Sequence, residues 1–152
     1  MSRPLTTLLA CALLSLIPST LLTRQEGQEE EHEETELEEH MHKIEDSLRK
    51  LRRSLRDESK RDASLEEIAA MQREALEAKL LTPSMAEALP AAERAAMIRA
   101  FRRTMVDVIA GQLELEAAIL DGDQEAARAA FRKVHDMEDA GHERFTIEEE
   151  EE

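Results

Sequence analysis

The stretch LEEHMHKIEDSLRKLRRSL, residues 37–55, decides the fold class of this chain. Its apolar residues are spaced 4, 3, 4, 3 and 4 apart, which is the repeat of a helix with one buried face. We therefore expect a helix from about Thr35 to Ser59. The apolar positions are Leu37, Met41, Ile44, Leu48, Leu51 and Leu55.

Three further helices follow from the same spacing and from local stop signals. Ser64 and Glu67 form a capping-box pattern that opens a second helix, which Thr82-Pro83 ends. A connection at 84–90 with room for one helical turn leads to a third helix, from about Pro90 to Leu120. Gly122 and Asp123 then mark a stop and a new cap, and a fourth helix spans about 124–145.

Composition supports an all-α chain, because there are only four Gly and four Pro and few β-branched residues. Four helices joined by short connections predict an antiparallel up-down-up-down four-helix bundle. The expected organisation is a signal peptide at 1–23, an acidic disordered linker at 24–35, the bundle domain at 36–146 and an acidic tail at 147–152.

The first 23 residues have the pattern of an export signal, with Arg3 followed by an uncharged, largely apolar run. Retention of this segment as a membrane anchor is the alternative, because the cleavage site is poorly marked. Cys11, the only cysteine, lies within the segment, so the mature chain would have no thiol for disulfides, metal binding or catalysis. We expect a periplasmic protein.

The exported part is strongly acidic. Residues 25–152 retain 18 of the 20 Lys and Arg and all 35 Asp and Glu. Nucleic acid is excluded as an expected partner, since phosphate contacts need a cationic surface. The acidic runs at 29–39 and 148–152 are typical of solvated tails, and docking of a basic redox partner is the alternative.

Met41 and His142 are the candidate site. Met41 is about five residues inside the first helix and His142 about four before the end of the last, so in an antiparallel bundle both lie about 6–8 Å below one rim. A thioether and an imidazole form a known axial ligand pair for haem iron. Met71, Phe101 and Met105 lie on the seams of the neighbouring helices.

Each of these residues also has an ordinary structural interpretation. A seam Met is usually core filler, and a His near a helix end is commonly a surface cation that interacts with the helix dipole. His135, one heptad before His142, would replace it if the register differs. His32, His40 and His42, with the Glu residues around them, could bind Zn or Cu weakly.

An ordered set of short motifs resembles the cytochrome b-562 family, soluble four-helix-bundle haem b proteins. The motifs are Leu37-Glu-Glu-His-Met41, Ala75-Leu-Glu-Ala78, Thr82-Pro83, Phe101 with Gly111-Gln112, and Asp121-Gly122 twenty residues before His142. The resemblance covers about 35–145. It implies a periplasmic electron carrier, not an enzyme, with non-covalent haem b held by Met41 and His142. It also implies that Met71, Phe101 and Met105 pack against the porphyrin.

Two features separate this chain from the family's relatives. The c-type bundle cytochromes carry Cys-x-x-Cys-His where this chain has Glu138-Asp-Ala-Gly-His142, so thioether attachment of haem is excluded. Glu138 is also a departure, because a carboxylate one turn before the ligand would repel haem propionates unless it were protonated or paired with a base. The alternative function is that of a haem-free bundle of the same ancestry, acting in envelope interactions or metal buffering.

Overall fold

The computed structural model describes residues 34–146, and this part of the chain is all-α, as predicted. About 86% of it is helical and it contains no strand. The predicted signal peptide, most of the predicted linker and the acidic tail lie outside the described residues. The elements are α1 Glu36–Ser54, the 3-10 turn η1 Glu58–Lys60, α2 Arg61–Ala78, α3 Ser84–Glu87, α4 Ala91–Asp121 and α5 Gln124–Phe145.

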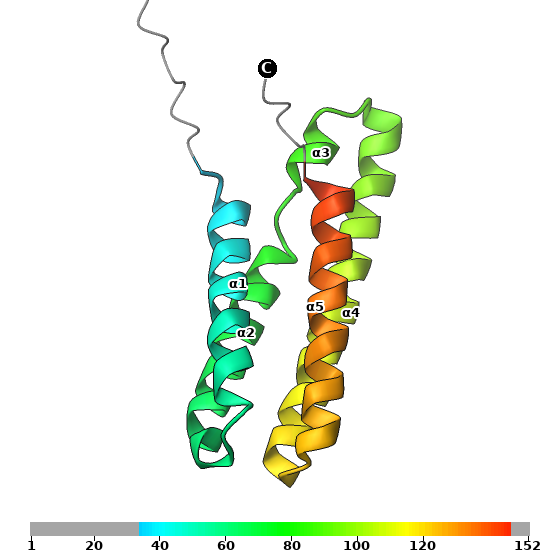
Figure 1. The fold of residues 1–152 in the computed structure, drawn as a ribbon. Helices are drawn as coiled ribbons and strands as arrows, with labels where there is room; N and C mark the ends of the chain where they lie inside the picture. Colours follow the sequence, from blue (N-terminus) through cyan, green and yellow to red (C-terminus); the bar gives the residue numbers. More distant parts are fainter. Residues whose placement is uncertain (1–33, 147–152) are drawn as a thin grey trace, which may run out of the picture. The chain divides into compact units, whose positions relative to one another are not determined.

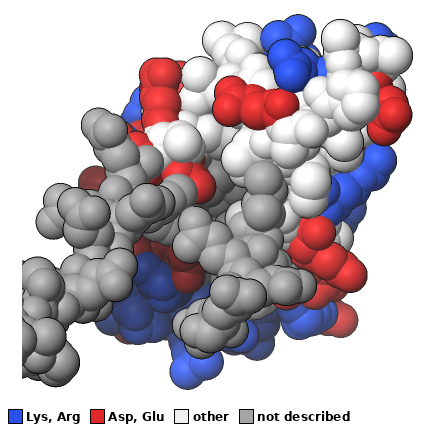
Figure 2. Space-filling view, turned by 90° about the horizontal axis from the view of Figure 1, so that it is seen from above, with Lys and Arg blue, Asp and Glu red and all other residues white. Residues whose placement is uncertain are grey.

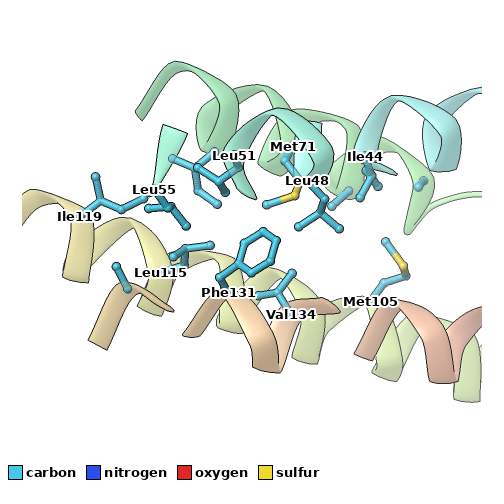
Figure 3. Close-up of a cluster of buried hydrophobic side chains, with 14 of the residues drawn as sticks. Ile44, Leu48, Leu51, Leu55, Met71, Met105, Leu115, Ile119, Phe131 and Val134 are labelled. Carbon is cyan, nitrogen blue, oxygen red and sulfur yellow. The ribbon is translucent and has the colours of Figure 1, made fainter. Parts of the chain in front are cut away.

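Four long helices lie side by side in this unit (Figure 1). α1 packs along α2, α4 packs along α5, and α2 packs against α4, while the single turn of α3 contacts α4 and α5. Their inward faces form one apolar cluster, part of which is shown in Figure 3. Within residues 34–146 no helix is both long enough and apolar enough to cross a bilayer.

The predicted seam of α1 is largely buried. Leu51 is completely buried, and Ile44, Leu48 and Leu55 are at most 5% exposed. Leu37 and Met41, at the start of the helix, are only partly buried, although both pack against the cluster. The depth of burial therefore increases along α1 from its first turn to its last.

The start of α1 is fixed by a capping box. The Thr35 hydroxyl accepts a hydrogen bond from the Glu38 backbone N–H, and the Glu38 carboxylate accepts one from the Thr35 backbone N–H at 2.7 Å. Both donors would otherwise lack a partner at the helix end. The predicted start near Thr35 is confirmed.

The predicted capping box at Ser64 and Glu67 is wrong. α1 ends at Ser54, and η1 runs directly into α2, which begins at Arg61, so Ser64 lies inside the helix. Its buried hydroxyl instead donates to the Ser54 hydroxyl at 2.7 Å. This polar contact joins α1 to α2, so Ser64 serves helix packing and not helix initiation.

The later boundaries agree with the prediction. Gly122 ends α4 in the left-handed conformation, with φ of 72°, which L side chains seldom adopt. Asp123 then caps α5, because its carboxylate accepts hydrogen bonds from the backbone N–H groups of Glu125 and Ala126. α2 ends at Ala78, before Thr82-Pro83, and α3 is the single turn expected in 84–90.

Candidate functional site

The two predicted ligands differ in exposure. Met41 is partly buried on α1 and packs against the apolar cluster. His142 is exposed in the last turn of α5, so its predicted place on the buried stripe is wrong. Gly141 is the partly buried residue at that turn, between the buried Glu138 and Phe145.

Charged groups on α5 and α1 lie close enough to influence each other. The carboxylate of Glu138 interacts electrostatically with Glu45 and Arg49 of α1, and with His142 on its own helix. Met41 lies one turn before Glu45, and His142 lies one turn after Glu138. A turn advances a helix by about 5.4 Å. If the two helices run in opposite directions, Met41 and His142 therefore lie along the same side, one turn beyond the Glu45–Glu138 level.

Glu138 is an unusual group for this position. It is only 8% exposed, and its Oε1 atom has no hydrogen-bond partner. Burial raises the pKa of the Glu138 carboxyl above its usual value, because desolvation disfavours the charged form. His142 and His135 act in the opposite direction and lower this pKa, while Glu45 and Asp139 raise it.

The three residues predicted to line a porphyrin belong to the core. Met71 is completely buried, and Phe101 and Met105 are 4% and 3% exposed. Phe101 also makes an edge-to-face contact with Phe145, with ring centroids 5.4 Å apart. Figure 3 shows Met71 and Met105 among the side chains of the cluster. Both sulfur atoms therefore lie in apolar surroundings.

Space remains beside His142. A Cβ atom added to Gly141 would meet no atom within 4 Å. Neighbouring Ala140 is exposed and small. The side of α5 formed by Ala140 and Gly141, next to the exposed His142, therefore carries little side-chain bulk.

A second group of ligating side chains joins α1 to α2. The buried His40 imidazole contacts Glu74 through Nδ1 at 2.7 Å and approaches Glu77 through Nε2 at 3.6 Å. One ligand atom from each of the three residues lies within 4.8 Å of the others. The Lys43 ammonium is 3.9 Å from the Glu74 carboxylate. Within residues 34–146, this is the one group of three His, Asp or Glu side chains placed closely enough to hold a metal ion.

His40 was predicted as a possible Zn or Cu ligand, whereas Glu74 and Glu77 were not. His42 is instead exposed beside Glu34, and His32 lies outside the described residues. The spacing of Glu74 and Glu77, three apart on one helix, was a signal for a shared face. Their pairing with His40 depends on the register of α1 against α2, which helix periodicity does not reveal.

His135, the alternative ligand, lies a few turns away on α5. Its Nδ1 atom is 3.6 Å from both the Glu138 and the Asp139 carboxylates and has no hydrogen-bond partner. Its ring lies 6.3 Å from that of Phe131. It therefore occupies a boundary position, as the sequence suggested.

The surface seen from above carries charges of both signs (Figure 2). Asp and Glu are interspersed with Lys and Arg around uncharged surface in this view. Comparison of the chain with family models, with curated proteins and with solved structures gives no match.

Proposed function

We propose that this chain is a haem b-binding electron carrier of the cytochrome b-562 type, with Met41 and His142 as axial ligands. The observation that supports the proposal is that Glu138, one turn before His142, is close enough to Glu45 and Arg49 of α1 to affect them through charge. Glu45 lies one turn after Met41, so this proximity is consistent with a shared side for the two proposed ligands. The proposal includes export to the periplasm and the absence of enzymatic activity.

The fold required by this proposal is an antiparallel up-down-up-down bundle of α1, α2, α4 and α5. Packing of α1 with α2, of α2 with α4 and of α4 with α5 supports it, because short connections favour antiparallel neighbours. The tightest connection, at Gly122-Asp123, separates the ends of α4 and α5 by only two residues.

Met41 and His142 carry the kinds of donor atom that haem iron binds. Met41 supplies a soft thioether, His142 supplies an imidazole that is free of hydrogen bonds with described residues, and Gly141 leaves space. Bound haem would supply a one-electron ferric–ferrous couple. Met71 and Met105 would exclude water from it, and an apolar lining with a thioether ligand favours the ferrous state.

Glu138 is the residue that fits least. A charged carboxylate beside propionates would weaken binding by repulsion. Burial raises the pKa of the Glu138 carboxyl, which favours its neutral form and reduces this repulsion. We therefore expect Glu138→Gln to bind haem more tightly than the wild type at the same pH.

Haem reconstitution of the purified chain tests the proposal. We expect a sharp Soret band that is lost in Met41→Ala and in His142→Ala. His135→Ala and His42→Ala are the matched controls, since each removes an imidazole from α5 or α1 without touching the proposed ligands. A colourless wild-type mixture refutes haem binding, and loss of the band in His135→Ala but not in His142→Ala refutes the ligand assignment.

A second candidate function is metal buffering by a haem-free bundle. The specific observation is the group formed by His40, Glu74 and Glu77. One imidazole nitrogen and two carboxylates give three protein ligands and leave a fourth position open, as in many zinc sites. The nearby Lys43 ammonium competes for Glu74, so weak binding is expected.

Titration with Zn²⁺ or Co²⁺ distinguishes this candidate. We expect one site per chain that His40→Ala abolishes and that His42→Ala, which removes the exposed neighbour, leaves intact. Equal loss in both variants would indicate scattered surface binding and would refute the three-residue site. The haem result is independent, because Met41 and His142 are unchanged in these variants.

Export has its own test. Mass spectrometry of the mature protein is expected to show a chain that begins near residue 24. A mature mass that includes residues 1–23 would instead support a membrane-anchored form. Partner binding through the acidic runs is expected to weaken with added salt.

A further inference from the structure

A hollow of about 210 Å³ lies between the last turn of α1 and the first half of α5. Its apolar lining is Leu55, directly after the end of α1, and Phe131 of α5, which are 5% and 9% exposed. His135 lines it beside Phe131. The remaining lining residues are four arginines: Arg52, Arg56, Arg128 and Arg132.

The four arginines concentrate positive charge at one place in an acidic chain. Acidic residues outnumber basic ones by 35 to 20. None of the four around the hollow forms an ion pair with a residue in 34–146. Positive charge is therefore left uncompensated at this place, although carboxylates are abundant elsewhere.

The spacing of the arginines adds to this imbalance. Arg128 and Arg132 are four residues apart on α5, so their like charges lie on adjacent turns of one helix face and repel each other. Arg52 lies in the last turn of α1, and Arg56 lies two residues beyond the end of that helix. All four line a single hollow, so an anion bound there would relieve the repulsion among them.

The apolar lining adds a second requirement. Guanidinium groups bind phosphate and carboxylate through two parallel hydrogen bonds. Leu55 and Phe131 offer apolar surface directly beside these groups. A ligand that satisfies both parts has an anionic head and an apolar segment.

We propose that this hollow binds a small anionic amphiphile, a molecule with a phosphate or carboxylate head on a short apolar chain. The four arginines hold the head, and Leu55 and Phe131 contact the chain. Arg132 precedes His142 by ten residues on α5, about 15 Å along the helix axis. The site is therefore separate from the proposed haem ligands and does not depend on them.

The test uses the full chain without haem, in low salt. Octyl phosphate, octanoate and inorganic phosphate are titrated and followed by calorimetry and by NMR of the α1 and α5 amides. We expect octyl phosphate or octanoate to bind at least about tenfold more tightly than inorganic phosphate, because only they reach Leu55 and Phe131. The two amphiphiles distinguish a phosphate head from a carboxylate head.

Paired substitutions locate the site. Arg52→Gln with Arg56→Gln, and separately Arg128→Gln with Arg132→Gln, should each weaken binding of the preferred probe at least about tenfold. Arg99→Gln with Arg102→Gln is the matched control, because it removes the same charge from exposed positions on α4. The control should change the affinity less than about twofold. Circular dichroism checks that every variant is folded, and the single variant Arg56→Glu repeats the test if a pair is not.

Three results would overturn the proposal. Equal affinity for inorganic phosphate and both amphiphiles would mean an adventitious ion only. Equal weakening by the α4 control would mean general attraction of anions to the surface. Tighter binding of a polyanion such as heparin, with loss in the same variants, would assign the hollow to a macromolecule instead.

Discussion

Replacing Glu138 with Gln tests how much the buried carboxylate of this residue destabilises the folded protein. The side chain is 8% exposed, and its Oε1 atom has no hydrogen-bond partner. Gln has nearly the same shape but cannot ionise. The substitution therefore removes the cost of burying a carboxylate while leaving the packing of α5 almost unchanged.

The expected gain follows from this burial. An unsatisfied buried polar group costs about 1–3 kcal/mol, and more when it is charged. Gln leaves polar atoms unpartnered as Glu does, so the gain is only the additional cost of burying the charge, about 1 kcal/mol at pH 7. For a unit of this size, this corresponds to a rise of about 4 °C in Tm.

The effect has a definite pH dependence. Burial raises the pKa of Glu138 in the folded chain above the usual value of 4.5, so the folded state holds this proton more strongly than the unfolded state. Stability from the protonated group is present below about pH 4.5 and is lost as the pH rises through the folded pKa. The advantage of Glu138→Gln should therefore be large at pH 7 and small below pH 4.5.

Urea unfolding followed by circular dichroism, repeated from pH 4 to pH 8, measures this difference. Asp139→Asn is the control, because it removes the same charge from an adjacent side chain that is 70% exposed. It should change stability by less than about 0.5 kcal/mol. A Glu138→Gln variant that is no more stable than wild type at pH 7, or whose advantage grows on acidification, would refute the reasoning. The wild type and Glu138→Gln share the same charged groups around this position, which are Glu45, Arg49, His135, Asp139 and His142.

Three further predictions test the fold, and Gln72→Leu serves as the control for the first. Gln112→Leu should stabilise the protein by about 1–3 kcal/mol in urea unfolding, since the amide is completely buried with both polar atoms unpartnered. Gln72→Leu, whose amide donates to a carboxylate at 2.8 Å, should show no such gain, and equal effects would contradict the explanation. Gly122→Ala should lower Tm by an amount equivalent to about 1–2 kcal/mol, because φ is positive at this residue; an unchanged Tm would mean that the turn relaxes. Thr35→Ala should cost about 1 kcal/mol through loss of the cap, and unchanged amide exchange in the first turn of α1 would argue against it.

The sequence predicted best those features that local chemistry determines. Gly122 and Asp123 end one helix and begin the next through their own backbone and side-chain preferences, and the structure confirms both. Ser64 has the same local chemistry as a cap. Its hydroxyl is nevertheless used in a contact with Ser54, which depends on how α1 meets α2. Tertiary packing overrode a valid local pattern at that position.

The candidate site was predictable only in part. His142 and Gly141 both continue a 3, 4 spacing between Glu138 and Phe145, because 3.6 residues per turn fits either position. The structure gives the partly buried position to Gly141. His40 was recognised as a possible ligand, but its neighbours Glu74 and Glu77 required the inter-helix register. The four arginines around the hollow were not predicted to lie together, because the negative net charge of the chain does not reveal a local excess of positive charge.

The gradient of burial along α1 has a consequence for motion. Leu51 is sealed in the interior, whereas Leu37 and Met41 are only partly covered. Segments with less buried apolar surface open at lower free energy than the whole protein unfolds. We therefore expect the first turn of α1, before the buried His40, to open at lower free energy than the whole protein unfolds. Such local opening would uncover the apolar surface against which Leu37 packs while the other helices stay folded.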